Sequence, residues 1–88
     1  MRLEVPEGTE VFIRHYRYVD DETYGLMPAK VAREAGYKFI GKGGMTEANV
    51  KLPDGRKAIG LAVCRQNEAF NKKIGRNIAV GRALKQLK

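Results

Sequence analysis

A hairpin in the second half of the chain is the feature that most constrains the fold. Apolar and polar residues alternate from residue 46 to residue 52, and this period of two is typical of a half-buried strand. The tripeptide Pro53-Asp54-Gly55 predicts a tight turn, because proline presets φ and glycine accepts the left-handed conformation. Residues 57 to 65 return as a second strand. One of its faces would let a helix pack closely, because its residues are small: Ala58, Gly60, Ala62 and Cys64.

The N-terminal part of the chain predicts a second hairpin. Residues 2 to 5 and 10 to 19 form its short and long arms around a turn at Pro6-Glu7-Gly8-Thr9, and an acidic loop follows over residues 20 to 27. Both faces of the long arm are partly apolar, so the sheet is either covered on both sides or uses one face for a partner. The two faces are Val11, Ile13, His15, Arg17 and Val19 against Phe12, Arg14, Tyr16 and Tyr18.

Two helices are expected. Residues 28 to 35 predict a short one, with Pro28 at its first position and Gly36 just past its end. A long one is expected from residue 68 to residue 87, with Asn67 as its N-cap and Glu68 in its first turn. Between them, residues 37 to 40 predict a brief strand and residues 41 to 44 a glycine-rich hinge.

These elements predict a single α+β domain over residues 1 to 88. It combines a small antiparallel sheet of about four strands with the short helix, and the long C-terminal amphipathic helix packs on one face. The length allows one hydrophobic core only. On a helical wheel the core side of the long helix holds Phe70, Ile74, Ile78, Val80, Gly81, Leu84 and Leu87.

The chain is basic, and its charge is uneven. The formal net charge is +7, from 17 Lys and Arg against 10 Asp and Glu. Residues 1 to 27 hold three Arg against six carboxylates, which gives −3, and residues 28 to 88 hold fourteen cations against four carboxylates, which gives +10. Such a bipolar molecule is steered toward a polyanion or an acidic protein with its C-terminal part first, although a solvated basic face is the plainer alternative.

Catalytic and cofactor chemistry find little support in the sequence. The chain has one His and one Cys, too few for a Cys-rich metal site, and no nucleophile and base can be paired by spacing. Residues 36 to 42 match the letters of a phosphate-binding loop, but Gly43 stands where the Ser or Thr that holds Mg²⁺ belongs. We therefore expect a protein that is not an enzyme and needs no metal or cofactor. No apolar run is long enough to span a membrane.

The long helix carries the first candidate site. Gly75, Ala79, Ala83 and Gln86 form a strip opposite the expected core side, and this strip is nearly free of side-chain bulk. A phosphate backbone could approach the helix there between two rows of cations, as could an acidic helix of a partner. Packing of the glycines within the fold is the structural alternative. The cations are Lys72, Lys73 and Arg76 with Arg82 and Lys85.

The long N-terminal arm carries the second candidate site. Arg14, Tyr16 and Tyr18 share a face with Phe12, and such a face could stack unpaired bases. The alternative is that this face forms core under a helix.

Part of the chain resembles known phage proteins. Residues 60 to 64, 70 to 76 and 78 to 84 read GLAVC, FNKKIGR and IAVGRAL. This string resembles the C-terminal part of small accessory proteins of tailed bacteriophages and prophages, which reads roughly G-x-A-x-C, F-x-K-K-I-G-R and I-A-x-G-R-A-L. Residues 43 to 46 resemble a Gly-Gly-x-Thr stretch that often lies upstream. The resemblance covers residues 43 to 84 and implies binding, as in anti-CRISPR proteins and transcription regulators, through Lys72, Lys73, Arg76 and Arg82.

The function expected is inhibition of a host nucleic-acid-guided defence nuclease through the basic helix. The partner would be a host ribonucleoprotein or nucleic acid in the bacterial cytoplasm. Two alternatives stay open, a DNA- or RNA-binding regulator of host or phage transcription and an interaction protein for an acidic host protein. A homodimer, in which a second copy completes the two-faced strands, is open as well.

Overall fold

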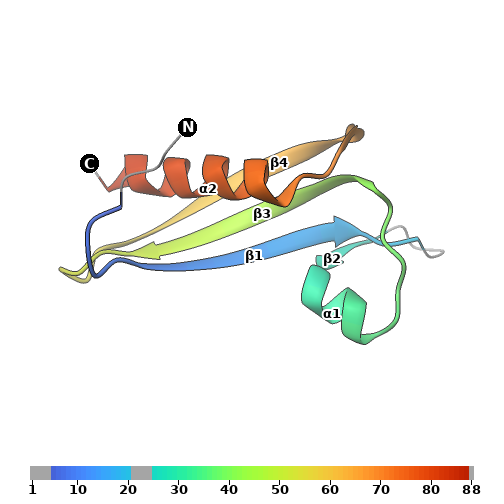
Figure 1. Ribbon diagram of the computed structural model, residues 1–88, viewed down its shortest axis with the longest axis horizontal. Helices are drawn as coiled ribbons and strands as arrows, with labels where there is room; N and C mark the ends of the chain where they lie inside the picture. The colour runs from blue at the N-terminus through green and yellow to red at the C-terminus, as the bar shows by residue number, and fades with distance from the viewer. Residues whose placement is uncertain (1–4, 21–24, 88) are drawn as a thin grey trace.

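The computed structural model describes residues 5–20 and 25–87 and confirms the expected α+β class. Its four strands form one antiparallel sheet in the order β2-β1-β3-β4. The longer helix lies across β3 and β4 on one face, and the shorter one lies beside β2 (Figure 1). The elements are β1 (Glu10–Tyr18), β2 (Leu26–Pro28), α1 (Ala29–Glu34), β3 (Lys42–Lys51), β4 (Lys57–Ala69) and α2 (Lys72–Gln86).

The predicted central hairpin is confirmed as β3 and β4, and both strands are longer than expected. Gly55 takes a φ of +95° in the turn, and the Leu52 amide donates to the Arg56 carbonyl at 2.8 Å. The hinge predicted over residues 41 to 44 is wrong, because β3 already begins at Lys42. Gly44 is buried there at φ +138°, and a Cβ on it would come within 2.7 Å of the Phe70 ring. Glycine therefore lets a strand pass beneath an aromatic ring.

The strand predicted over residues 10 to 19 is confirmed as β1, but its partners differ from the predicted one. β1 pairs with β3 on one side and with β2 on the other, over Tyr16–Tyr18. The predicted short arm lies outside the described residues except for Val5, which is in no strand. Of the predicted acidic loop, residues 21 to 24 lie outside the described residues, and its last two residues belong to β2.

The short helix is confirmed to within one residue at each end. Pro28 immediately precedes α1, and Gly36 adopts a φ of +81° just beyond it. The brief strand predicted over residues 37 to 40 reduces to one bridge, between Phe39 and Val19.

The predicted start of the long helix is wrong. β4 runs on to Ala69, which still pairs with Lys42, so Asn67 and Glu68 lie in the strand. The N-cap is Asn71, whose side chain accepts a hydrogen bond from the Ile74 amide at 3.1 Å. Both asparagines suit a cap, and strand pairing selects the second.

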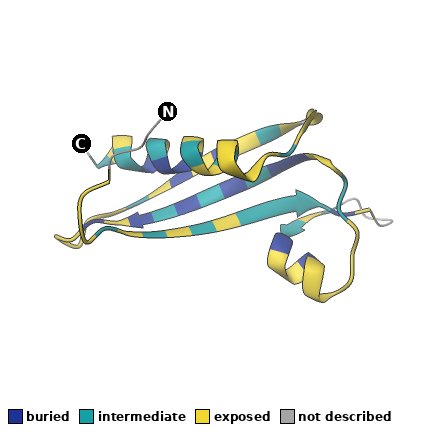
Figure 2. Ribbon diagram, in the orientation of Figure 1, coloured by how far each residue is buried: buried dark blue, intermediate teal, exposed yellow. Residues whose placement is uncertain are grey.

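The predicted core side of α2 is right for Val80 and Leu84, which pack in the core, and wrong for Ile74 and Ile78, because the helix is rotated about its axis. Ala79 and Ala83 are fully buried against the sheet, whereas Ile74 and Ile78 are 58% and 43% exposed. A Cβ on Gly60 of β4 would collide with the Ala79 carbonyl, so the two backbones are in close contact. The expected packing of a helix against the small face of β4 is thus confirmed. The side of α2 that contacts this face is the one with small residues, Ala79 and Ala83 (Figure 2). The buried cluster between them is Ala48, Ala62, Ala79 and Val80.

Candidate nucleic-acid interface

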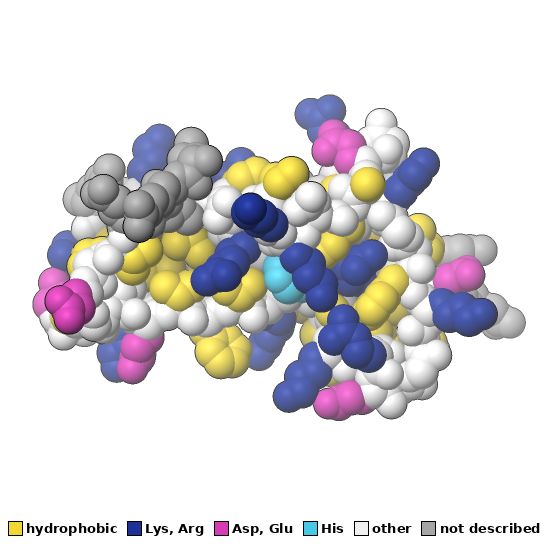
Figure 3. Space-filling model, in the orientation of Figure 1, with side chains coloured by type: hydrophobic (Ala, Val, Ile, Leu, Met, Phe, Trp, Pro, Cys, Tyr) yellow, Lys and Arg dark blue, Asp and Glu magenta, His cyan; other side chains and the backbone are white. Residues whose placement is uncertain are grey.

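A groove lies between α1 and the first turn of α2, over β1. Its volume is about 500 Å³, and its floor is the first half of β1. Figure 3 shows Lys and Arg side chains (dark blue) gathered around the histidine (cyan) on this face. The lining residues are Phe12, Ile13, Arg14, His15, Pro28, Ala29, Lys30, Val31, Arg33 and Lys72.

The groove exists because β2 is short. Its three residues pair only with the end of β1, and the chain then turns into α1 at Ala29. The first half of β1 therefore has no strand beside it on this side among the described residues. The Val19 amide points toward β2, where it donates to the Gly25 carbonyl. Along a strand, every second residue directs its N–H and C=O groups to the same side, so those of Ile13 and Val11 also point to this side. Backbone donors and acceptors thus line the open edge.

Cations from three elements converge on this groove. Lys30 and Arg33 come from α1, one turn apart on the same side of the helix, Arg14 comes from β1 and Lys72 from α2. None of the described residues that line the groove is an Asp or a Glu. The charge of the described lining is therefore positive, and Glu47, opposite Arg14 in the strand register, lies outside it.

His15 lies on the floor of the groove. Its Nδ1 is 2.9 Å from the Thr46 hydroxyl, and the Phe70 ring meets the imidazole edge-on at 5.7 Å between centroids. Burial lowers the pKa of His15, and the charges of Lys72, Arg17 and Arg76 lower it further. The imidazole is therefore neutral at pH 7, which keeps it compatible with the cations around it.

Arg17 provides a half-buried charge behind the groove. Its guanidinium carbon lies 4.8 Å from the centre of the Phe39 ring and 4.4 Å from that of Phe70, so the group is held between two aromatic faces. Burial and the nearby Arg33 lower the pKa of Arg17. Its buried Nε has no hydrogen-bond partner among the described residues. The two rings, with the Ile40 carbonyl 3.5 Å from Nη2, restrict where the guanidinium can lie.

The cations predicted on α2 divide into three groups. Lys72 and Arg76 lie close enough to His15 to act on its charge. Arg82 instead reaches the edge of the sheet, where its Nη1 donates to the Leu61 carbonyl at 2.7 Å. Lys73 and Lys85 are exposed and do not line the groove.

The other predicted site residues have different surroundings from those expected. The bare strip around Gly75 faces the sheet, and a Cβ on Gly75 would come within 2.5 Å of the Thr46 hydroxyl. Tyr16 and Tyr18 are half-buried and alternate along β1 with His15, which shares the α2 face with Thr46, so they lie on the other face of the sheet. The predicted alternative of core beneath a helix therefore does not hold. Arg14 starts on that face too and lines the groove at the strand edge, with a hydrogen bond to Tyr16 raising its pKa.

The sequence analysis did not identify the α1 side of the groove, with Lys30 and Arg33, or His15 on its floor. The helix over residues 28 to 35 was predicted, and the i, i+3 spacing of Lys30 and Arg33 was a readable sign of a basic side. The convergence of these residues with His15 depends on strand order, which no local pattern contains.

The described residues hold neither a metal-binding group nor a membrane-spanning helix. In residues 5–20 and 25–87, no three His, Cys, Asp or Glu side chains lie together as a metal-binding group. No helix within those ranges has the length and apolar character needed to cross a bilayer.

Comparison with known proteins gives no relative. No protein-family model matches the chain, and neither a curated protein nor a solved structure is similar to it.

Proposed function

We propose that this protein binds nucleic acid without catalysing a reaction, and that backbone phosphates bind in the groove between α1 and α2. The observation that carries the proposal is the convergence of Arg14, Lys30, Arg33 and Lys72 on a concave surface whose described lining includes no carboxylate. Phosphate oxygens bind to such cations, and the release of counterions from the polyanion drives the association.

An unpaired strand fits the groove better than a duplex. Phe12 is 66% exposed at the groove, and an aromatic face next to cations can stack a base while the cations hold the phosphates. The peptide groups of Ile13 and Val11 add hydrogen-bonding partners at the open strand edge. An acidic protein would use the cations but would have no equivalent need for the exposed ring.

The salt dependence of binding tests the proposal. Fluorescence anisotropy would follow a labelled 20-nucleotide single strand and the matching duplex from 50 to 300 mM salt. For single strands, the slope of log affinity against log salt should lose about 0.7 for each phosphate contact removed. We expect Arg33→Ala and Lys72→Ala each to show this loss.

Lys85→Ala is the matched control, because it removes the same charge from the last turn of α2, outside the groove. Equal losses for Lys85→Ala and Lys72→Ala would show that only net charge matters and would overturn the proposed site. Binding that is insensitive to salt would overturn nucleic-acid binding altogether.

A narrower form of the proposal names the target, a host nucleic-acid-guided defence nuclease. It is supported by the resemblance of residues 43 to 84 to phage accessory proteins, and by a basic groove that could compete for guide or target strands. A pull-down from bacterial lysate, with and without added nuclease, tests it. Recovery of a ribonucleoprotein that nuclease treatment abolishes would support this target, and recovery of a single acidic protein after treatment would contradict it.

A further inference from the structure

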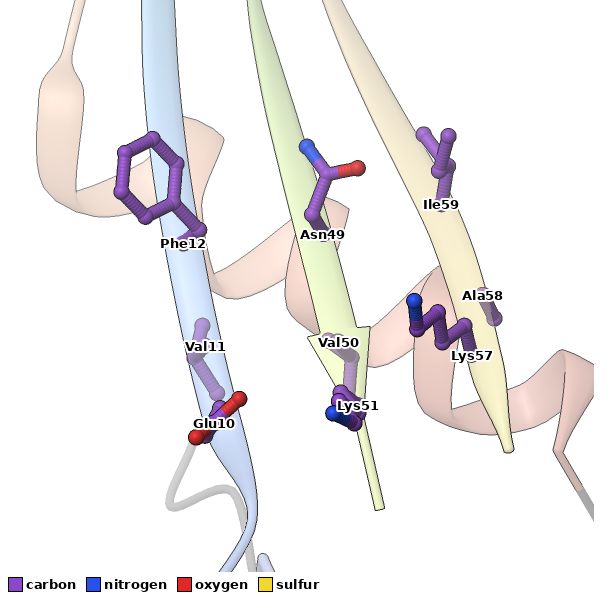
Figure 4. Close-up of a pocket in the computed structure, with 9 residues that line it drawn as sticks. All are labelled: Glu10, Val11, Phe12, Asn49, Val50, Lys51, Lys57, Ala58 and Ile59. Atoms are coloured by element: carbon purple, nitrogen blue, oxygen red, sulfur yellow. The ribbon is translucent and has the colours of Figure 1, made fainter. Parts of the chain in front are cut away.

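The sheet face away from α2 is uncovered and carries large apolar side chains. Phe12, Asn49 and Ile59 lie side by side across β1, β3 and β4 on this face (Figure 4). The next two rows in register are Arg14–Glu47–Leu61 and Tyr16–Met45–Val63. The most exposed apolar members of this open face are Val63 at 71%, Phe12 at 66%, Ile59 at 52% and Leu61 at 42%.

The distribution of side chains is unusual for a molecule that works alone. Among the described residues, the largest fully buried side chains are Val19, Val50 and Thr46. A single copy therefore leaves the larger Phe12, Ile59 and Leu61 of the open face in contact with water.

We propose that the open face is a homodimer interface, in which two copies stack their sheets face to face. A twofold interface places the same patch against itself, so a patch of one charge sign is unsuitable. The open face carries charges of both signs, because Arg14 is opposite Glu47, and Glu10 shares a row with Lys51 and Lys57 in the strand register. The described lining of the groove includes cations and no carboxylate, so the groove suits a polyanion instead.

Edge-to-edge pairing through β4 is the alternative, and α2 opposes it. β4 is the outer strand of the sheet, and the carbonyls of Ile59 and Leu61 point outward from it. Gln86 and Arg82 of α2 donate to these two carbonyls at 2.9 and 2.7 Å. The side chains of the helix therefore cover these two positions of the β4 edge, which disfavours pairing with another strand there.

Phe12 and Arg14 belong both to the open face and to the lining of the groove, so stacking would cover that side of each groove. The side formed by His15 and Lys72 stays exposed, because α2 lies on the opposite side of the sheet. If the grooves bind nucleic acid as proposed, the dimer presents two of them and gains avidity on a strand long enough to reach both. This consequence rests on the proposed function, whereas the dimer itself does not.

Sedimentation equilibrium of the full chain tests the dimer. At about 100 µM protein we expect twice the 9.9 kDa of one chain. Ile59→Lys and Val63→Lys should each raise the dissociation constant of the dimer at least tenfold, because each copy would bury an unpaired ammonium group in the interface. Ile74→Lys is the matched control, since Ile74 is 58% exposed, close to the 52% of Ile59, but lies on α2.

Circular dichroism would verify that each variant is folded, and the high exposure of Val63 makes its substitution the least disruptive. A wild-type mass of 9.9 kDa at 100 µM would overturn the dimer and leave another partner as the occupant of this face. A dimer that survives both Ile59→Lys and Val63→Lys would overturn the interface. Dimerisation without salt-dependent nucleic-acid binding would refute the proposed function alone.

Discussion

Gly75 lies directly against Thr46, and a Cβ on this glycine would come within 2.5 Å of the Thr46 hydroxyl. The same hydroxyl is 2.9 Å from Nδ1 of His15. The absence of a side chain at one position of α2 thus allows the helix to approach β3 and sets the distance from its first turn to the floor of the groove. Packing and the candidate site depend on the same contact.

Gly75→Ala should destabilise the protein by about 1–3 kcal/mol, because the added methyl must displace either Thr46 or the helix. The sign is informative. Alanine is favoured over glycine in a helix interior by about 1 kcal/mol, so a free surface position would give stabilisation instead. Urea unfolding measures the change, and a more stable variant would contradict the packing described here.

Gly60→Ala should be more damaging. Its Cβ would collide with the carbonyl of Ala79, and backbone atoms give way less readily than a side chain. We expect a loss of at least about 3 kcal/mol, at the upper end of overpacking effects. Leu61→Ala, at the next position of β4 but on the open face, is the control and should cost much less. Thermal unfolding followed by circular dichroism compares the two.

Removing the cover of the β4 edge should promote association of a different kind. Arg82→Ala together with Gln86→Ala frees the carbonyls of Leu61 and Ile59 on a long outer strand. Exposed strand edges template further pairing, so we expect species larger than the dimer in light scattering. Lys85→Ala, from the same turns of α2, should produce none. Unchanged scattering by the double variant would show that these two side chains do not protect the edge.

The fold class followed from local patterns that tertiary contacts do not override. The turn at Pro53-Asp54-Gly55 and the proline and glycine that bracket α1 act through φ alone, so both were predictable. The orientation of α2 was not. By hydropathy, Ile74 and Ile78 should mark the core side of the helix. The sheet, however, presents Gly60 and Ala62, and α2 can approach these small residues closely only with its own small residues.

The candidate site was predictable only in part for a related reason. Lys72 and Arg76 were identified from the charge on the helix, but their neighbours His15 and Arg17 lie more than fifty residues away in the sequence. The order of the strands in the sheet brings these residues together, and the alternation of residues along β1 does not predict that order. The cap at Asn71 was missed because Asn67 offers the same chemistry four residues earlier.

The folded protein should lose stability as the pH falls below about 6.5, the ordinary pKa of histidine. Burial and the charges of Lys72, Arg17 and Arg76 hold the pKa of His15 below that value in the folded state. Between the two pKa values the unfolded chain binds more protons, so stability rises with pH through this window and is complete above it. In the wild-type protein, the urea midpoint of unfolding should rise between pH 5 and pH 8. His15→Gln should make this midpoint depend less on pH.

Binding should respond to pH in the opposite direction. A phosphate near His15 would favour the imidazolium and raise the pKa of His15, so binding takes up a proton and tightens as the pH falls through the same window. Anisotropy titrations of the wild-type protein and His15→Gln at constant salt measure the difference between their pH slopes. Equal slopes for the two proteins would place the phosphates away from the floor of the groove.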